Sequence, residues 1–133
     1  MQAHVRTLMN DQLITVFPED TLVDVAREIA AHGIGAVPVV DNEQSLVGIL
    51  STSDLVRLLH KGGRLEGKLA RDTMSPEPIS IDEFATVDEA IGVMQNAQIR
   101  HLPVVREGRL VGLVTDADLI RHLMRSNLAP EVA

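Results

Sequence analysis

The sequence LVGILSTSDLVRLL at residues 46–59 returns as LVGLVTDADLIRHL at residues 110–123. An upstream stretch, residues 5–40, likewise returns at residues 70–105. The offset is 65 residues for the upstream stretch and 64 for the downstream one, and 15 of the 50 aligned pairs are identical. Unrelated stretches of this composition would share about three. The chain is therefore a tandem repeat of two copies.

Helix signals stand at the same places in both copies. The first helix is predicted to begin at Thr21 and Thr86, because each threonine precedes a carboxylate by three residues, the spacing of a capping box. Apolar residues then recur at three- and four-residue spacing, which predicts one buried face. These helices are expected to end near Gly33 and Gln98.

Short apolar runs complete the pattern. They predict strands at residues 14–16, 36–40 and 46–50 in the first copy and at residues 79–81, 102–105 and 110–115 in the second. Each copy opens with a short helical lead-in that ends at Met9 or Met74, and a second helix follows from about Thr52 or Asp116. The chain is thus expected to be α/β (α+β), with two β-α-β-β-α units.

The predicted units are residues 5–60 and 69–125, joined by residues 61–68. Three glycines and mixed charges predict a flexible linker there, not a third domain. A unit of about 60 residues buries too little surface to be stable alone, so we expect the two to pack on each other. The tail after Arg125 has no periodic pattern and is expected to fray.

Composition excludes several classes of function. The net charge of −7 repels a phosphate backbone, and Phe17 and Phe84 are the only aromatic residues for base stacking, so no nucleic-acid partner is expected. The absence of cysteine excludes disulfides, thiolate metal sites and thiol catalysis. No stretch approaches about 18 uncharged apolar residues, so we expect a cytoplasmic protein with no membrane partner.

The junctions between the third strand and the second helix carry the strongest chemical signal. Residues 48–54 and 112–118 both fit Gly-h-h-[Ser/Thr]-x-x-Asp, where h is apolar. A nucleotide could bind there, because glycine permits close approach, a helix N-terminus presents N–H donors, and a carboxylate accepts bonds from a ribose diol. A capping box needs the same residues at the same spacing. The spacing alone leaves both interpretations open.

Together with these junctions and the tandem arrangement, the strands IGAVPVV at residues 34–40 and IRHLPVV at residues 99–105 resemble the CBS module, named after cystathionine β-synthase. The resemblance covers nearly all of the chain. It implies two modules packed sheet to sheet as a pseudo-twofold pair, with two clefts that bind adenosine-containing ligands. It also implies a homodimer formed through paired helices.

The resemblance assigns site residues by position. Asp54 and Asp118 would take ribose hydroxyls, and Ser51 and Thr115 would lie near the sugar or phosphate. The residues whose backbone would contact or flank the adenine are Thr15, Val37, Ser80 and Leu102, with Pro38 and Pro103 shaping the strands.

The copies differ where a phosphate needs a cation. The second copy has Arg100 and His101 before its Leu-Pro, whereas the first has Gly35 and Ala36 before Val-Pro. We expect Arg100 to bind the phosphate, its alternative being a solvated arginine paired with a carboxylate. His101 either contacts the ligand or packs at the strand edge. Asp116 would repel a phosphate unless it pairs with Arg100 or with Mg²⁺.

These features predict a regulatory binding module, not an enzyme. The sequence has no Ser-His-Asp order, Walker loop, dinucleotide fingerprint or histidine pair at zinc spacing, so we predict no catalytic and no metal-binding residues. The expected ligand is AMP, ADP or ATP, with no obligatory cofactor, and occupancy would be signalled to an effector protein by conformational change. The alternatives are a ligand-free interaction or dimerisation module, and an S-adenosylmethionine or NAD binder that regulates a partner enzyme or transporter.

Overall fold

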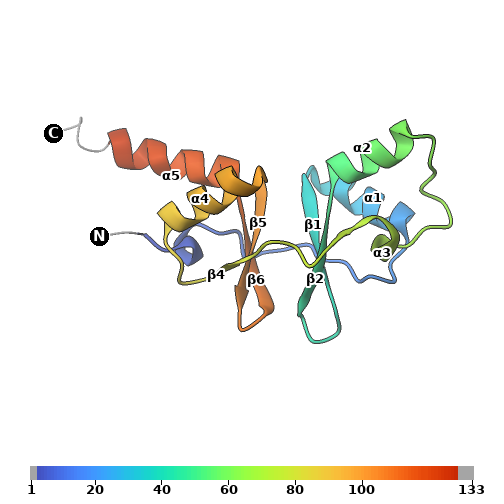
Figure 1. Cartoon of the computed structure of the whole chain (residues 1–133), viewed down its shortest axis with the longest axis horizontal. Coiled ribbons are helices and arrows are strands. Elements are labelled where there is room, and N and C mark those ends of the chain that lie inside the picture. The colour runs from blue at the N-terminus through green and yellow to red at the C-terminus, as the bar shows by residue number, and fades with distance from the viewer. Residues whose placement is uncertain (1–2, 129–133) are drawn as a thin grey trace. The chain divides into compact units, whose positions relative to one another are not determined.

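The computed structural model describes residues 3–128 and divides them into two compact units. The first-repeat unit comprises residues 14–78 and 108–110, and the second-repeat unit comprises the remainder. The elements are numbered in chain order, and Figure 1 labels most of them. The helices are η1 (Val5–Thr7), α1 (Leu22–His32), α2 (Thr52–His60), α3 (Ala70–Thr73), α4 (Val87–Ala97) and α5 (Asp116–Leu128). The strands are β1 (Ala36–Val40), β2 (Leu46–Ser51), β3 (Ser75–Pro76), β4 (Ile81–Asp82), β5 (His101–Arg106) and β6 (Arg109–Thr115).

Each unit has a three-stranded sheet and its own apolar core. In the first-repeat unit the strand order is β1-β2-β3, and both pairings are antiparallel. In the second-repeat unit the order is β4-β5-β6, and β4 runs parallel to β5. The buried faces of the helices pack on these sheets, with Leu22 and Leu55 in one core and Val87 and Leu119 in the other. The predicted mixed fold with two similar units is confirmed.

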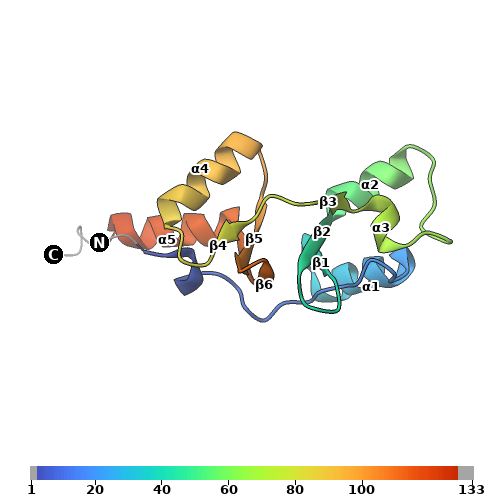
Figure 2. The ribbon, with the colours of Figure 1, turned by 60° about the horizontal axis from the view of Figure 1, so that its bottom comes forward.

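The lead-in segments are exchanged between the two sequence repeats. β3, which belongs to the second repeat of the sequence, pairs with β2 (Figure 2). Asn10, from the first lead-in, bridges Leu113 on β6 through two backbone hydrogen bonds of 2.9 and 3.0 Å. Val5 and Ala70 occupy equivalent positions, and each is fully buried in the core built on the other repeat. The compact units therefore differ from the sequence repeats by this exchange.

The same exchange accounts for the glycine of each junction motif. A Cβ atom at Gly48 would collide with the side chain of Met74, and one at Gly112 would collide with that of Met9. Both methionines come from the lead-in of the other repeat. A methionine therefore makes a close approach to each glycine in this structure, and approach of a ligand to the same backbone stays a prediction.

The predicted ends of the first helix in each copy are confirmed. The hydroxyls of Thr21 and Thr86 accept backbone N–H groups three residues ahead, at 3.2 and 3.1 Å. Gly33 and Gln98 end the helices in the left-handed conformation, with φ of 61° and 55°.

The first predicted strand of each copy is shorter than expected. Val16 makes only an isolated parallel bridge to β1, and β4 begins at Ile81 instead of residue 79. The partner strands explain the short pairing, because Pro38 lies on β1 and Pro103 on β5. To extend each pairing by two residues toward the N-terminus, the partner strand would have to donate an N–H from its proline, which proline lacks.

The segment predicted as a flexible linker is held against the first-repeat unit. Leu65 packs on the core, the Lys68 carbonyl accepts the Leu22 N–H at 2.9 Å, and Gly63 donates to the Leu58 carbonyl at 2.9 Å. The expectation for the tail was wrong at its start, because α5 continues three residues past Arg125. Residues 129–133 lie outside the described part of the chain.

A buried carboxylate paired with an exposed arginine distinguishes the second-repeat unit. The Glu83 side chain is only 2% exposed, and Arg106 donates to both of its carboxylate oxygens. This hydrogen bonding by Arg106 holds the pKa of Glu83 below its ordinary value. Nearby, the Arg6 guanidinium lies 5.1 Å from the centre of the Phe84 ring and ties the first lead-in to this unit.

Candidate functional site

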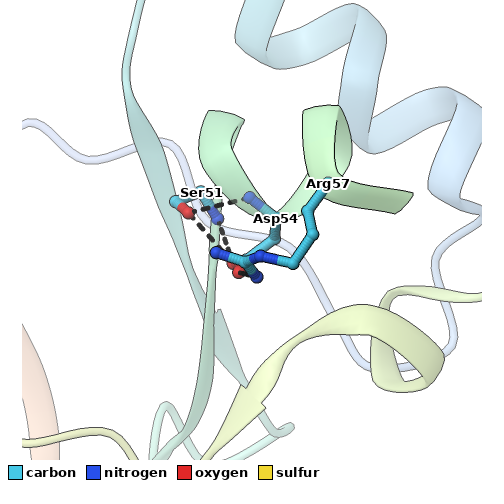
Figure 3. A network of polar contacts seen from close by, with 3 residues as sticks. All are labelled: Ser51, Asp54 and Arg57. Atoms are coloured by element: carbon cyan, nitrogen blue, oxygen red, sulfur yellow. Dashed lines mark hydrogen bonds and ion pairs between the residues drawn. The ribbon is translucent and has the colours of Figure 1, made fainter. Parts of the chain in front are cut away.

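The first junction forms a closed capping box where β2 ends and α2 begins (Figure 3). The Ser51 hydroxyl accepts the backbone N–H of Asp54 at 3.3 Å. In return, Oδ2 of Asp54 accepts the backbone N–H of Ser51 at 2.9 Å and its hydroxyl at 3.0 Å. The capping role is therefore present, and contact of Ser51 and Asp54 with a ligand stays a prediction.

The second junction repeats this geometry where β6 meets α5. Oδ2 of Asp118 accepts the backbone N–H of Thr115 at 2.9 Å, and the Thr115 hydroxyl accepts the backbone N–H of Asp118 at 3.2 Å. The carboxylate side chains of Asp54 and Asp118 are 14% and 18% exposed. Each junction thus holds a nearly buried carboxylate in a fixed orientation.

An arginine that was not among the predicted site residues lies at each junction. Arg57 lies one helical turn after Asp54, and its Nη1 donates to Oδ1 of that carboxylate at 3.2 Å. Arg121 makes the equivalent bond to Oδ1 of Asp118 at 2.6 Å. A signal was present, because both copies contain Asp-x-x-Arg and residues three apart on a helix are neighbours.

A backbone hydrogen bond holds the start of β1 beside the first junction, and another holds the start of β5 beside the second. The N–H of Thr52 donates to the Gly35 carbonyl at 2.9 Å, and that of Asp116 donates to the Arg100 carbonyl at 3.1 Å. Arg100 and His101 are thereby placed at the second junction, as the sequence required for a phosphate-binding role. The first junction has Gly35 and Ala36 in their place.

Charges at the second junction act on His101. Burial lowers the pKa of this half-buried histidine, and the charge of Arg100 lowers it further, whereas the charge of Asp116 raises it. Among residues 3–128, Arg100 is exposed and forms no ion pair with Asp116. The sequence predicted that Asp116 pairs with Arg100 or with Mg²⁺, and the pairing with Arg100 is not formed in this structure.

The four strand residues predicted near the adenine have buried side chains. Val37 and Leu102 are fully buried in their cores, and Pro38 and Pro103 are buried beside them. Only their backbone can face a ligand, which is the role that the resemblance gave them. The Pro38 carbonyl already accepts the N–H of Val16 at 3.1 Å.

Thr15 and Ser80 each lie just before a residue that pairs with β1 or β5. Val16 bridges Val39 on β1, and Ile81 pairs with Val104 on β5. Thr15 is half-buried and Ser80 is exposed. Thr15 is thus held next to β1 and Ser80 next to β5, and their contact with adenine stays a prediction.

Two further findings concern metal binding and membrane crossing. Within residues 3–128, no three His, Asp or Glu side chains gather closely enough to hold a metal ion. In the same range, every helix is too short or too polar to cross a membrane.

Comparison with known proteins adds independent observations. The family model described as CBS domain matches residues 5–61 and again residues 70–125. Hypoxic response protein 1 of Mycobacterium tuberculosis is 36% identical over 123 residues, which are 89% of this chain and 83% of that protein.

Two solved structures resemble the chain and contain adenosine compounds. CBSX2, a CBS-pair protein of Arabidopsis thaliana, was solved in complex with AMP; it is 26% identical, with a TM-score of 0.85 over 93% of this chain and 98% of that one. The CBS domain pair of MJ0100 was solved with 5′-methylthioadenosine and S-adenosyl-L-methionine; it is 26% identical, with a TM-score of 0.86 over 95% and 99% of the two chains.

Proposed function

Because the chain belongs to the CBS domain family, we propose that it is a regulatory module that binds AMP, ADP or ATP. The observation that carries this proposal is the pair of junctions, each holding a nearly buried carboxylate beside a hydroxyl and a helix N-terminus. Such a carboxylate suits a ribose diol, because it accepts charge-assisted hydrogen bonds in a fixed direction. The AMP complex of CBSX2 supports the same ligand class.

The proposed output is conformational. A ligand shifts an equilibrium only if it binds one state more tightly than the other, so the bound form would be read by an effector protein or by a second copy of the chain. Apolar side chains on the outer faces of two helices support a homodimer. They are Val56 and Leu59 on α2 and Ile120, Leu123 and Met124 on α5, all at least 38% exposed.

Two further parts of the proposal concern conditions and chemistry. A cytoplasmic location is supported by the absence of cysteine, which suits a reducing compartment. No catalytic step is assigned, and the ligand acts as a signal. Mg²⁺ would enter with a nucleotide polyphosphate and offset the charge of Asp116.

A thermal-shift titration of the ligand-stripped protein tests the ligand class. At a concentration of 100 times Kd, a ligand that binds only the folded protein stabilises it by about 2.7 kcal/mol, which raises Tm by roughly 10 °C for a domain of this size. We expect a concentration-dependent rise with at least one of AMP, ADP and ATP, and inosine 5′-monophosphate serves as the control that differs from AMP only in the base. A rise with S-adenosylmethionine alone would instead favour the ligand seen with MJ0100. Flat curves with every adenosine compound would favour a ligand-free interaction module.

The phosphate role of Arg100 has its own test. Arg100→Ala is expected to weaken AMP by about tenfold and to leave adenosine within about twofold, because Arg100 is exposed and its backbone carbonyl is bonded to the second junction, which brings a cationic side chain to that region. Isothermal titration calorimetry measures both ligands. Equal losses for AMP and adenosine would exclude a phosphate role for this arginine.

A further inference from the structure

Arg57 and Arg121 have no role in the function proposed so far. They occupy equivalent positions in the two repeats, and each donates to Oδ1 of its junction carboxylate. Figure 3 shows the Arg57 side chain folded back so that its guanidinium lies beside Asp54.

The two oxygens of each carboxylate are divided between the cap and the arginine. Oδ2 of Asp54 already accepts two hydrogen bonds from Ser51, whereas Oδ1 accepts one from Arg57. A carboxylate oxygen has two lone pairs, so a ligand hydroxyl has its opening at Oδ1 of Asp54, and Oδ1 of Asp118, which accepts one bond from Arg121, has room for a hydroxyl as well. Any group that binds there comes to lie next to the guanidinium.

The arginines also have donors to spare on the solvent side. Their side chains are 58% and 62% exposed, against 14% and 18% for the carboxylates that they contact. A guanidinium has five N–H donors, and each arginine gives one of them to its aspartate. The remaining donors suit the planar, charge-assisted binding of a phosphate.

A third pair in the chain shows what an ordinary surface pair looks like. On α1, Arg27 lies 3.5 Å from Asp24, which also stands three residues after a capping threonine. The Asp24 side chain, however, is 66% exposed. Exposed pairs of this kind contribute little, so the low exposure of the junction carboxylates sets Arg57 and Arg121 apart.

We propose that Arg57 and Arg121 bind the anionic group of the adenosine ligand and make both repeats selective for phosphorylated ligands. This inference rests on the proposed function and deepens it. It supplies the first repeat with the cation that its Gly35 and Ala36 do not provide. The two repeats then differ in having one phosphate-binding arginine or two, because Arg100 stands only at the second junction.

Calorimetric titration with AMP and adenosine tests the inference in variants that keep only one of the two junction carboxylates. Arg57→Gln is measured in a chain that carries Asp118→Ala, and Arg121→Gln in one that carries Asp54→Ala, so each experiment reports on one repeat. We expect AMP to bind about tenfold more weakly in both and adenosine to change by less than about twofold. The matched control, Arg27→Gln, should leave both affinities unchanged, and lysine in place of Arg57 or Arg121 should restore part of the preference for AMP.

Each other outcome overturns a stated claim. Unchanged AMP affinity in the glutamine variants would refute the inference while the proposed function stands. Equal losses for AMP and adenosine would show that the arginines act only by positioning the aspartates. Failure of the unmodified chain to bind either ligand would refute the proposed function, and this inference with it. A thermal melt of each variant confirms that it is folded.

Discussion

Val5→Asp is expected to destabilise the unit built on the second repeat by about 3 kcal/mol or more. Val5 is fully buried and packs in the core that contains Ile81, Leu102 and Val104, although it belongs to the first repeat in sequence. An aspartate there would place an unpaired charge in an apolar core. The equivalent change, Ala70→Asp, should act on the other unit, because Ala70 is buried in the core that contains Val37 and Leu50.

Hydrogen exchange of the backbone amides of β1 and β5 measures the loss of stability in each unit. Val5→Asp should reduce protection in β5 more than in β1, and Ala70→Asp should do the reverse. Gln12→Asp, at an exposed position that follows the same lead-in, serves as the control and should leave both strands protected. The same ranking of β1 and β5 in both core variants would contradict the exchange of lead-ins.

Asp118→Ala is expected to weaken AMP binding at the second junction by tenfold or more and to lower the stability by about 1 kcal/mol. The two effects have separate causes. The stability falls because the backbone N–H of Thr115 loses its acceptor, and the affinity falls because the ribose loses the carboxylate that would receive it. Titration of AMP and a thermal melt of the same sample measure them independently.

Asp24→Ala is the matched control for this prediction. Asp24 is likewise the third helical residue after a capping threonine and pairs with an arginine three residues ahead, but its side chain is 66% exposed. Its removal should leave AMP affinity unchanged. If Asp118→Ala lowers only the melting temperature, the junction aspartates are helix caps, and the ligand role must be withdrawn.

The candidate site could be predicted in part. The Ser51–Asp54 and Thr115–Asp118 spacings, together with the resemblance, located both junctions, and the structure places Arg100 and His101 beside the second one. Arg57 and Arg121 could have been found, because Asp-x-x-Arg is a local pattern repeated in both copies. The division of the two carboxylate oxygens between cap and arginine depends on side-chain geometry, which spacing does not specify.

The shortened first strands show a similar limit. Alternating apolar residues predicted strands at 14–16 and 79–81, but a strand forms only where its neighbour offers hydrogen-bonding partners. Pro38 and Pro103 withhold one N–H group at the position that would extend each pairing. The cause was visible in the sequence, but it acts only once the partner strand and its direction are known.

The sequence by itself determined the tandem repeat, the helix boundaries and the two junctions, because capping boxes, left-handed helix ends and apolar periodicity act between residues close along the chain. Tertiary structure alone decided which lead-in completes which core and why Gly48 and Gly112 lack side chains. Val5 and Ala70 are both small and apolar, and either could fill a gap beside either sheet. Which core each residue fills depends on packing between segments that are distant in the sequence, since the two repeats are alike in local pattern.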